Sequence, residues 1–285
     1  MKTWLVIDAS YLCYRALYAT GGLRYGEIAT GVVFGFFHEV IALQDLFDTT
    51  NVAFCFDSPQ SLRRKIFPAY KLKRHSRQRT EAELKQRVEL MEQMHALRKE
   101  YLPAVGYQNI FSATGFESDD CIASLVKNLP DNAEAVIISA DNDLLQLLAP
   151  GVLIHNPQTR KTQTHFSFIR DYGFEPKLWA KVKAYGGCKS DEVPGVTGGY
   201  KEKTAIKFVQ GKLKETSSAY QLYTSDETHY IVQRNKKLVK LPFEGTPKFE
   251  LLPDDLSEAG WKKVMDKLGM KSLRLRAPFA GRRRR

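Results

Sequence analysis

The segment WLVID, from Trp4 to Asp8, is a short apolar run that ends at an aspartate, and two later segments repeat this design. They are VAFCFD, from Val52 to Asp57, and AVIISAD, from Ala135 to Asp141. Continuous apolar runs of this length are typical of strands buried on both faces of a parallel sheet. Helical spacing predicts helices at residues 31–46, 81–101 and 117–129. The sequence therefore predicts an α/β fold with a mostly parallel central sheet flanked by helices.

The second part of the chain has a different texture. A further strand is expected at residues 152–155, and helices at 179–185 and 204–213, on either side of a glycine-rich stretch. The segment THYIVQRNKKLVKLP, residues 228–242, resembles two short strands around a polar turn. The last 25 residues, from Trp261, hold ten basic residues and one acid and close in Arg282 to Arg285.

Composition limits the classes of function. The 285 residues carry 43 Lys and Arg against 32 Asp and Glu, a formal charge of +11, which favours a polyanionic partner. No apolar run approaches the roughly 18 residues of a membrane-spanning helix, and the first residues are typical of a strand rather than a signal peptide. The four cysteines are far apart and form no CxxC pair, which favours a reducing intracellular compartment.

Acidic residues follow the predicted strands. Because ligands collect at the carboxyl ends of parallel strands, Asp8, Asp57 and Asp141 should converge on one edge of the sheet. FESDD adds Glu117, Asp119 and Asp120, and Asp143 follows Asp141 by two residues. Glu117 and Asp120, three apart, should share a helix face, whereas Asp119 should point elsewhere and cap or hydrogen-bond.

Each strand-end aspartate could also simply cap the helix that follows it. A shared site for all of these acids is costly unless cations neutralise their repulsion. Oxygen-only ligands suit Mg²⁺ or Mn²⁺ rather than zinc, and this many acids would suit two ions. Such a pair could activate water and stabilise the leaving oxygen of a phosphodiester.

A basic run and a glycine-rich turn complete the pattern. LRRKIFPAYKLKRHSRQR, residues 62–79, has eight Lys or Arg and no acid. Such a run is often only a solvated face, but the interleaved Phe67 and Tyr70 favour phosphate contacts and base stacking. VPGVTGGYKEKTA, residues 193–205, places glycines before a helix, where backbone N–H groups can approach a phosphate.

In this order the motifs resemble the 5′-nuclease superfamily of flap endonucleases and 5′–3′ exonucleases, especially its phage and bacterial polymerase-associated members. The resemblance covers about residues 4–241. LVIDASYLCYRA and FCFDS look like the first two family motifs, GFESDDCIA and SADNDLLQL like the later acidic ones, and SDEVPGVTGG like the helix-three-turn-helix element that grips duplex DNA.

The resemblance implies roles for individual residues. It implies metal-ligand roles for Asp8, Asp57, Glu117, Asp119, Asp120, Asp141, Asp143 and Asp191. Catalytic roles in phosphate handling and substrate positioning are implied for Tyr70, Lys71 and Arg74. DNA contacts are expected from Arg63, Lys73, Arg77, Gly195, Gly198, Lys201, Lys203 and Thr204. The cofactors implied are two Mg²⁺ or Mn²⁺ ions, with K⁺ at the helix-three-turn-helix element.

What the resemblance implies overall is a structure-specific two-metal nuclease that cuts near single-strand/duplex junctions. We expect a PIN-like catalytic domain at residues 1–183 with a helical arch at about 62–101, a helix-three-turn-helix subdomain at 184–255 and a basic segment at 256–285. Expected partners are DNA with a 5′ flap or a 5′ end at a junction, and RNA primers. Family members usually act in replication and repair. We therefore expect the protein in the cytoplasm of a bacterial or phage-infected cell, and we expect it to be a monomer.

The chain departs from the family pattern at two places. Cys188 stands where an acid of the second metal site is expected, and a thiol is a poor Mg²⁺ ligand, whereas Asp191 remains. Glu192 stands where Asn is usual and could reach into the site. The glycine hairpin has Gly199, Tyr200 and one extra residue before Lys203.

Two other classes of function remain open at this level. Cys188 favours a protein of the same fold that binds flaps or junctions without cutting, although a pure binder would not require the other acids. A phosphatase on an α/β sheet is disfavoured, because Asp8 lacks the second aspartate two residues later that haloacid-type phosphatases use. The charge of +11 also suits a polymer better than a small ester.

Overall fold

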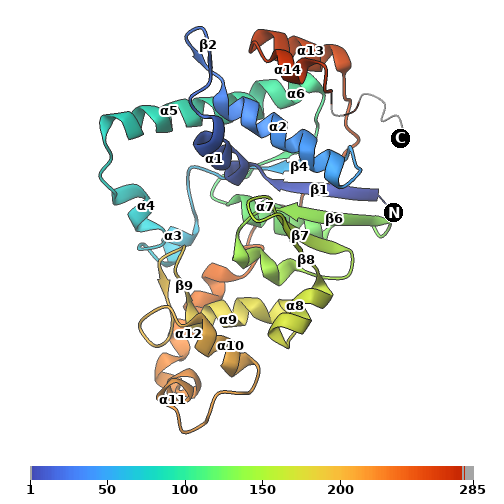
Figure 1. Cartoon of the computed structure of the whole chain (residues 1–285). Coiled ribbons are helices and arrows are strands. Elements are labelled where there is room, and N and C mark those ends of the chain that lie inside the picture. Colours follow the sequence, from blue (N-terminus) through green and yellow to red (C-terminus); the bar gives the residue numbers. More distant parts are fainter. Residues whose placement is uncertain (1, 278, 280–285) are drawn as a thin grey trace.

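The computed structural model describes residues 2–277 and 279, and the terminal arginines Arg282 to Arg285 lie outside the described residues. Within them, a six-stranded sheet has the order β5, β4, β1, β6, β7, β8 (Figure 1). All neighbours pair parallel except β7 and β8, which confirms the predicted mostly parallel sheet. The strands are β1 (Lys2–Asp8), β4 (Val52–Cys55), β5 (Ile110–Phe111), β6 (Ala133–Ile138), β7 (Val152–Asn156) and β8 (Lys161–Gln163).

Strand β1 lies at the centre of the sheet and is buried on both faces. Leu5 and Ile7 join one hydrophobic cluster and Val6 joins the other, as the alternation of side chains along a strand requires. The register pairs Asp8 with Cys55 on β4. Adjacent parallel strands therefore end at the same edge, and the residues that follow them meet there.

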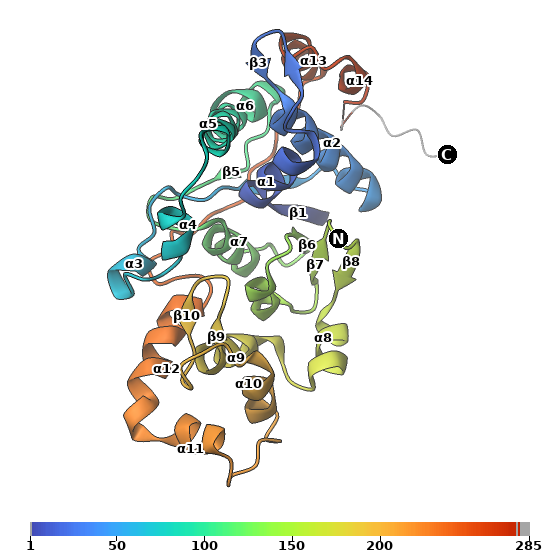
Figure 2. The same cartoon turned by 60° about the vertical axis from the view of Figure 1, so that its left-hand side comes forward.

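Helices cover both faces of the sheet. The cluster around Leu5 and Ile7 is closed by α1 (Ala9–Thr20), α2 (Gly31–Leu46), α5 (Glu81–Ala96), the π-helical turn η1 (Leu97–Tyr101), α6 (Leu102–Val105), α13 (Glu258–Lys267) and α14 (Lys271–Arg274). A small hairpin, β2 (Arg24–Tyr25) with β3 (Ile28–Ala29), lies beside α13 (Figure 2).

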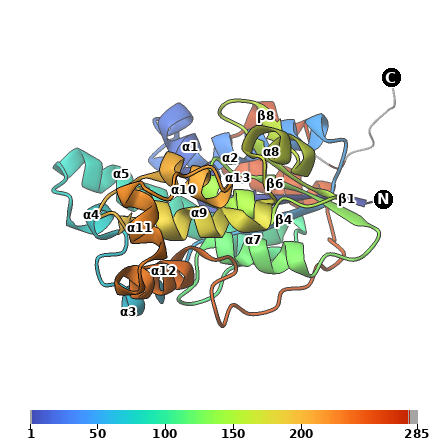
Figure 3. The ribbon, with the colours of Figure 1, turned by 90° about the horizontal axis from the view of Figure 1, so that it is seen from below.

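The opposite face carries α7 (Ser118–Lys127), the 3-10 turns η2 (Asn142–Leu147) and η3 (Pro176–Leu178), α8 (His165–Tyr172) and α9 (Trp179–Gly186). The chain continues through β9 (Gly187–Cys188), β10 (Val193–Pro194), α10 (Glu202–Val209), α11 (Ser218–Thr224) and α12 (Asp226–Val239), and α10 and α12 pack against α9. Seen from below, this group of helices lies in front of the sheet (Figure 3). None of the helices in the described residues is long and apolar enough to cross a membrane.

The expectation of two strands at residues 228–242 is wrong, because this segment forms most of α12. Ser225 caps the helix by accepting a hydrogen bond from the Glu227 N–H. The buried side chains include Thr228, Val232 and Val239, which are spaced as one helix face. Of the polar residues that suggested a turn, Gln233, Lys236 and Lys237 are exposed. Asn235 is fully buried and donates to the carbonyls of Ala184 and Pro194.

Two short helices connect β4 to α5. They are α3 (Arg63–Ile66) and α4 (Leu72–Ser76), and α5 begins at Thr80 with a capping box to Glu83. The α4 end of this segment contacts the β9–β10 hairpin, because the Lys71 N–H donates to the Asp191 carbonyl at 3.0 Å. The basic run is therefore attached at Lys71 to the β9–β10 hairpin.

The segment 240–257 carries the chain from α12 back along the sheet edge to α13. Its Leu252 exchanges two hydrogen bonds of 2.8 Å with the side chain of Asn109, which directly precedes β5. Trp261 of α13 is fully buried, with its ring 5.1 Å from that of Phe37 on α2 and its indole N–H donating to the Leu273 carbonyl. Helix α13 therefore completes the hydrophobic core on one face of the six-stranded sheet.

Replacing Trp261 with alanine should destabilise the whole molecule, because it leaves a large cavity against α2. We expect the free energy of unfolding in urea to fall by about 3 to 5 kcal/mol. Lys263→Ala, at an exposed position of the same helix, is the control and should change it by less than about 0.5 kcal/mol. Equal stability of the two variants would show that α13 is not part of this core.

Candidate active site

Four aspartates line a cavity of about 320 Å³ at the carboxyl edge of the sheet. Asp8 ends β1, Asp57 follows β4, Asp119 lies in the first turn of α7, and Asp141 precedes η2. Other side chains on the cavity wall are Ser10, Tyr11, Tyr14, Lys71, Arg74, Glu117, Ser118 and Ser139. We call Asp8, Asp57, Asp119 and Asp141 the four-aspartate group.

Two members of this group also have the capping role that the simpler interpretation assigns to them: Asp8 accepts a hydrogen bond from the Tyr11 N–H and Asp141 accepts one from the Asp143 N–H. Asp57 does not cap the helix that follows it and instead accepts a hydrogen bond from the Ser118 N–H at the start of α7. Each of these bonds occupies one carboxylate oxygen. Capping and a shared site are therefore compatible, since the capping bonds fix the direction of the carboxylates.

The four-aspartate group carries negative charge that the nearby Lys71 offsets only in part. Burial and the neighbouring Asp57 raise the pKa of Asp8 to about 7, and burial and Asp143 raise the pKa of Asp141 to about 6. Burial, Asp141 and Asp8 also raise the pKa of Asp119. In the described part of the chain, none of the four forms an ion pair within 4 Å. Divalent cations would relieve this repulsion.

The residue order within FESDD has a structural consequence. Glu117 is the N-cap of α7 with extended backbone angles, so the helix begins one residue later, at Ser118. Asp119 therefore lines the cavity, although we expected it to point elsewhere. Asp120 is fully buried away from the cavity, and its carboxylate accepts a hydrogen bond from the Glu117 N–H at 3.0 Å.

The expected roles of Arg63 as a DNA contact and of Asp120 as a metal ligand do not fit this geometry. Arg63 is 2% exposed and forms a two-fold ion pair with Asp120, at 2.6 and 2.8 Å. Its Nε donates to the Leu238 carbonyl of α12, and the Phe243 N–H donates to Asp120. All of these groups lie inside the protein, so the pair joins α3, α7 and α12.

Glu117, Tyr70 and Lys71 form a linked group at the cavity wall. One oxygen of Glu117, Oε2, accepts hydrogen bonds from Tyr70 at 3.0 Å and from Lys71 Nζ at 2.8 Å. Burial by itself would raise the pKa of Glu117, but Lys71 and Arg63 lower it below its usual value. Glu117 is therefore a charged partner of Lys71, and the Lys71 ammonium lies beside the four-aspartate group.

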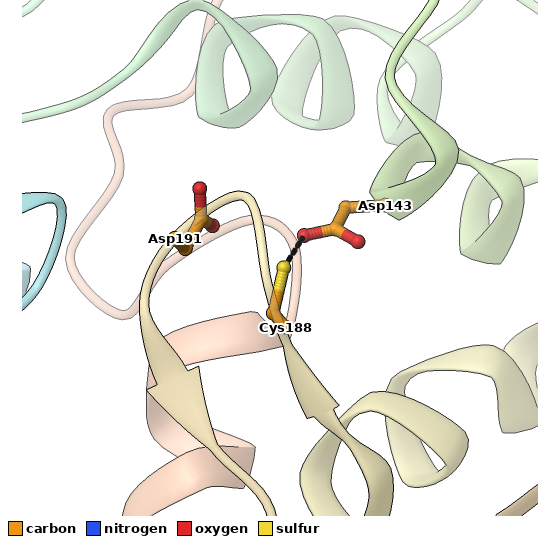
Figure 4. Close-up of side chains that lie close together, drawn as sticks. All are labelled: Asp143, Cys188 and Asp191. Atoms are coloured by element: carbon orange, nitrogen blue, oxygen red, sulfur yellow. Dashed lines mark hydrogen bonds between the residues drawn. The ribbon is translucent and has the colours of Figure 1, made fainter. Parts of the chain in front are cut away.

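A second acidic group lies beside the first. Asp143, Cys188 and Asp191 are buried, and their ligand atoms all lie within 4.8 Å of one another (Figure 4). No other three such residues in the described chain are as compact. The thiol of Cys188 donates to Asp143 Oδ2 at 3.2 Å, and burial raises the pKa of this thiol well above its ordinary range. We call these residues the second cluster.

The second cluster already contacts basic side chains. Lys183 Nζ lies 3.0 Å from Asp143 Oδ1, and Lys71 Nζ lies 3.3 Å from Asp191 Oδ1. Tyr70 also donates to Asp191. Glu192, which we expected could reach into the site, turns away and accepts a hydrogen bond from the Lys73 N–H at 3.1 Å. The oxygen donors of the four-aspartate group therefore fit Mg²⁺ or Mn²⁺ better than the second cluster does.

The other expected DNA contacts surround the site at a distance. Lys73 and Arg77 belong to the exposed α4 region, where Arg77 pairs with Glu83. Gly187, at φ 83°, has no room for a side chain, because a Cβ would lie 2.5 Å from the Gly195 nitrogen. This close approach shapes the turn that leads to α10. Gly195, Gly198, Lys201, Lys203 and Thr204 lie in this turn and in the first residues of α10.

Sequence reasoning missed several side chains of the site, among them Tyr14 and Lys183. Tyr14 lines the cavity from α1, and only its position two turns after the Asp8 cap could have indicated this. Lys183 was expected as an ordinary helix residue. The sequence could have indicated its role, because Lys183 lies between the apolar residues Val182 and Ala184, and all three are buried. A buried charge requires a partner of opposite charge.

Oxygen-only acids at the carboxyl edge of a parallel sheet, next to Lys71 and Arg74, have the chemistry that a metal-dependent phosphodiester hydrolase requires. The same sheet and helices occur in known nucleases. A solved structure of the bacteriophage T5 5′-exonuclease with bound divalent zinc ions has a TM-score of 0.70, at 20% identity over 85% of this chain and 90% of that one. The catalytic core of Rad2 in complex with a DNA substrate has a TM-score of 0.57, at 15% identity over 97% and 92%.

The sequence comparisons define the family. Residues 3–173 match the 5′–3′ exonuclease N-terminal resolvase-like domain. A 5′–3′ exonuclease of Bacillus subtilis is 33% identical over 216 residues, which cover 72% of this chain and 69% of that protein. The chain belongs to the 5′–3′ exonuclease family.

The raised pKa values of Asp8 and Asp141 predict how the metal-free protein responds to pH. Their ordinary value is 3.8, so between about pH 4 and 7 the folded chain keeps protons that the unfolded chain releases. The stability from these groups is present below pH 4 and is lost as the pH rises through 6 to 7. In EDTA, Asp8→Asn should reduce the loss of unfolding free energy between pH 5 and 8 by on the order of 2 kcal/mol.

Urea unfolding at each pH measures this difference. Asp131→Asn, at an exposed position outside the site, is the control and should follow the native curve. Parallel curves for native protein and Asp8→Asn would contradict the electrostatic account of the four-aspartate group.

The Arg63–Asp120 pair predicts a loss of stability rather than of DNA contacts. Arg63→Met leaves the Asp120 carboxylate buried without its partner, which should cost about 3 to 5 kcal/mol of unfolding free energy. Lys65→Met, at an exposed position of the same short helix, should leave stability nearly unchanged. A stable Arg63→Met variant with weakened DNA binding would instead support the expected phosphate contact.

Proposed function

We propose that this nuclease hydrolyses DNA phosphodiesters close to a single-strand/duplex junction, acting on 5′ flaps and 5′ ends. The observation that carries the proposal is the four-aspartate group, which opens to a cavity beside Lys71 and Arg74 and forms no ion pair within 4 Å in the described residues. Within this group Asp8 is buried, Asp119 and Asp141 are half-buried and Asp57 is exposed. A protein that only binds junctions has no need of four clustered acids that repel one another. The non-catalytic alternative is therefore not favoured.

We assign Mg²⁺ or Mn²⁺ to the four-aspartate group, with two ions in the working enzyme. When bound, such ions activate water and stabilise the leaving oxygen of the phosphodiester. Asp8 and Asp57 are held in place by their hydrogen bonds to backbone N–H groups and to Ser139. The donors are thus oriented before an ion arrives, which lowers the cost of assembling the site.

Lys71 and Arg74 supply positive charge at the cavity. Lys71 Nζ is held by Glu117, and the half-exposed guanidinium of Arg74 donates to the Ser190 carbonyl and lies 3.7 Å from Asp191. Both can interact with a scissile phosphate and stabilise charge that develops during hydrolysis. Tyr70, by contrast, is buried and donates to Glu117 and Asp191, so its proposed part is to position the charged groups.

Substrate would be held on two sides of the cavity. We propose that the segment 62–101 forms the arch beside the single strand, and that residues 184–255 hold the duplex through the turn before α10. Backbone N–H groups and the exposed Lys201 and Lys203 in that region suit a phosphate backbone. The Thr197 hydroxyl is buried without a hydrogen-bond partner in the described residues, which supports a K⁺ ion in this turn.

The finer assignments follow from the same features. The charge of +11 favours nucleic acid over small esters as the substrate. The proposed substrates include RNA primers paired with DNA, because RNA carries the same phosphate charge. Free buried cysteines suit a reducing cytoplasm, in a bacterial or phage-infected cell. We propose a monomer that removes primers and flaps during replication or repair, with residues 256–285 as a basic C-terminal segment.

Cleavage of a labelled 5′-flap duplex in EDTA, Mg²⁺ and Mn²⁺ tests this function. Native protein should cut only with a divalent ion, and Asp57→Ala should lower the rate at least about a hundredfold because it removes a metal ligand. Flap binding by Asp57→Ala in Ca²⁺ should remain close to native. The matched control is Asp131→Ala, an exposed acid outside the site, which should cut as fast as native protein.

Two results would contradict the proposal. The first is Mg²⁺-dependent cutting that survives in both Asp57→Ala and Asp141→Ala. The second is tight flap binding by native protein without cutting in any metal, which would favour a junction-binding protein of the same fold.

A further inference from the structure

Lys183 places a positive charge inside the second cluster. It comes from α9, is 7% exposed, and its Nζ lies 3.0 Å from Asp143 Oδ1 and 2.9 Å from Glu202 Oε2. The same nitrogen lies 5.5 Å from the centre of the Trp179 ring, which is itself buried. The lysine is therefore fixed on three sides, and its ammonium belongs to the cluster rather than to solvent.

The remaining atoms of the second cluster also have partners. Cys188 donates its thiol hydrogen to Asp143 Oδ2 (Figure 4), and Asp143 Oδ1 accepts no hydrogen bond but faces the Lys183 ammonium as an ion pair. Asp191 is contacted by Tyr70, Lys71 and Arg74. Each carboxylate of the cluster thus faces an ammonium: Asp143 faces Lys183, and Asp191 faces Lys71. The four-aspartate group has no such partners in the described residues, so the two groups differ in kind.

We propose that Lys183 is the built-in cation of the second cluster, so that the free protein binds one divalent ion firmly at the four-aspartate group and a second ion only weakly. This inference rests on the proposed function, because it assumes that both groups serve a metal-dependent nuclease. A second ion at Asp143 and Asp191 must displace the ammonium or bind beside it. Either route costs Coulomb energy at short range in a buried site.

The replacement of an acid by Cys188 and the presence of Lys183 act in the same direction. A thiol removes one negative charge from the cluster and offers a soft donor that hard cations avoid. The ammonium then balances the charge of Asp143 without any ion. Lys183 is a positioning residue in this scheme, because its contacts to Asp143 and Glu202 keep it away from the cavity and from substrate.

Mn²⁺ binding to the full chain without DNA tests the inference, with free Mn²⁺ measured by electron paramagnetic resonance. Native protein should show one firm site and a second site about tenfold or more weaker. Lys183→Met should strengthen the second site by about tenfold or more and leave the first unchanged. Combined with Cys188→Asp, it should strengthen the second site further.

Three control variants make the result specific. Lys181→Met, on the exposed side of the same helix, removes the same charge outside the cluster and should bind Mn²⁺ as native protein does. Lys183→Arg keeps the charge and should keep the weak second site. Asp57→Asn should remove the firm site and leave the weak one.

Lys183→Met leaves Asp143 without its cation and could lower stability, so thermal unfolding is measured in parallel. The melting temperature of this variant should rise more with added Mn²⁺ than that of native protein, because the ion replaces the lost charge. Two equal firm sites in native protein would overturn the inference, as would an unchanged second site in Lys183→Met. The flap assay reports separately on the proposed function, since cleavage can fail while the Mn²⁺ result holds.

Discussion

The crowding of negative charge at one edge of the sheet is the constraint on which the rest of the site depends. Parallel strands end side by side, so Asp8, Asp57 and Asp141 meet because the backbone register brings them there. Burial raises the pKa of Asp8 and Asp141, and repulsion from Asp57 at Asp8 and from Asp143 at Asp141 raises it further. The neighbouring basic residues and hydrogen bonds can be understood as the means by which the fold tolerates this charge.

The protein divides its acids into two kinds. Asp120, Glu117, Asp143 and Asp191 each have a basic side chain within reach, and these pairs join elements that are far apart in sequence. The four-aspartate group has no ion pair in the described residues and opens to the cavity. Structural ion pairs thus surround a site whose own charge is left for an external cation. The difference lies in the surroundings of each carboxylate rather than in the residue type.

Much of this arrangement could be predicted from sequence, because it depends on local rules. Apolar runs that end at aspartates predicted the sheet and its acidic edge. The roles of Asp119 and Asp120 were exchanged, because the face of a helical residue depends on where the helix begins, and Glu117 is a cap rather than the first helical residue. Arg63 looked like a DNA contact because its partner Asp120 lies 57 positions away in the chain.

The segment at residues 228–242 failed for a related reason. Its apolar positions fit either spacing over a few residues, and packing on α9 decided for helix. Lys183 could be noticed as a charge between apolar neighbours, but its partner Asp143 comes from η2 on another part of the chain. The contacts that could not be predicted from the sequence are therefore those between distant segments of the chain.

The return of the chain through segment 240–257 has a mechanical consequence. The group formed by β9, β10 and α10 to α12 is joined to the sheet by two covalent connections, one through α9 and the other through this returning segment (Figure 2). A module attached at two points cannot swing on a single hinge, and Arg63 adds a third attachment through the Leu238 carbonyl. A duplex held by these helices would keep a fixed distance to the cavity. The distance between the bound duplex and the cleaved phosphodiester would then be fixed by the attachment of these helices to the sheet.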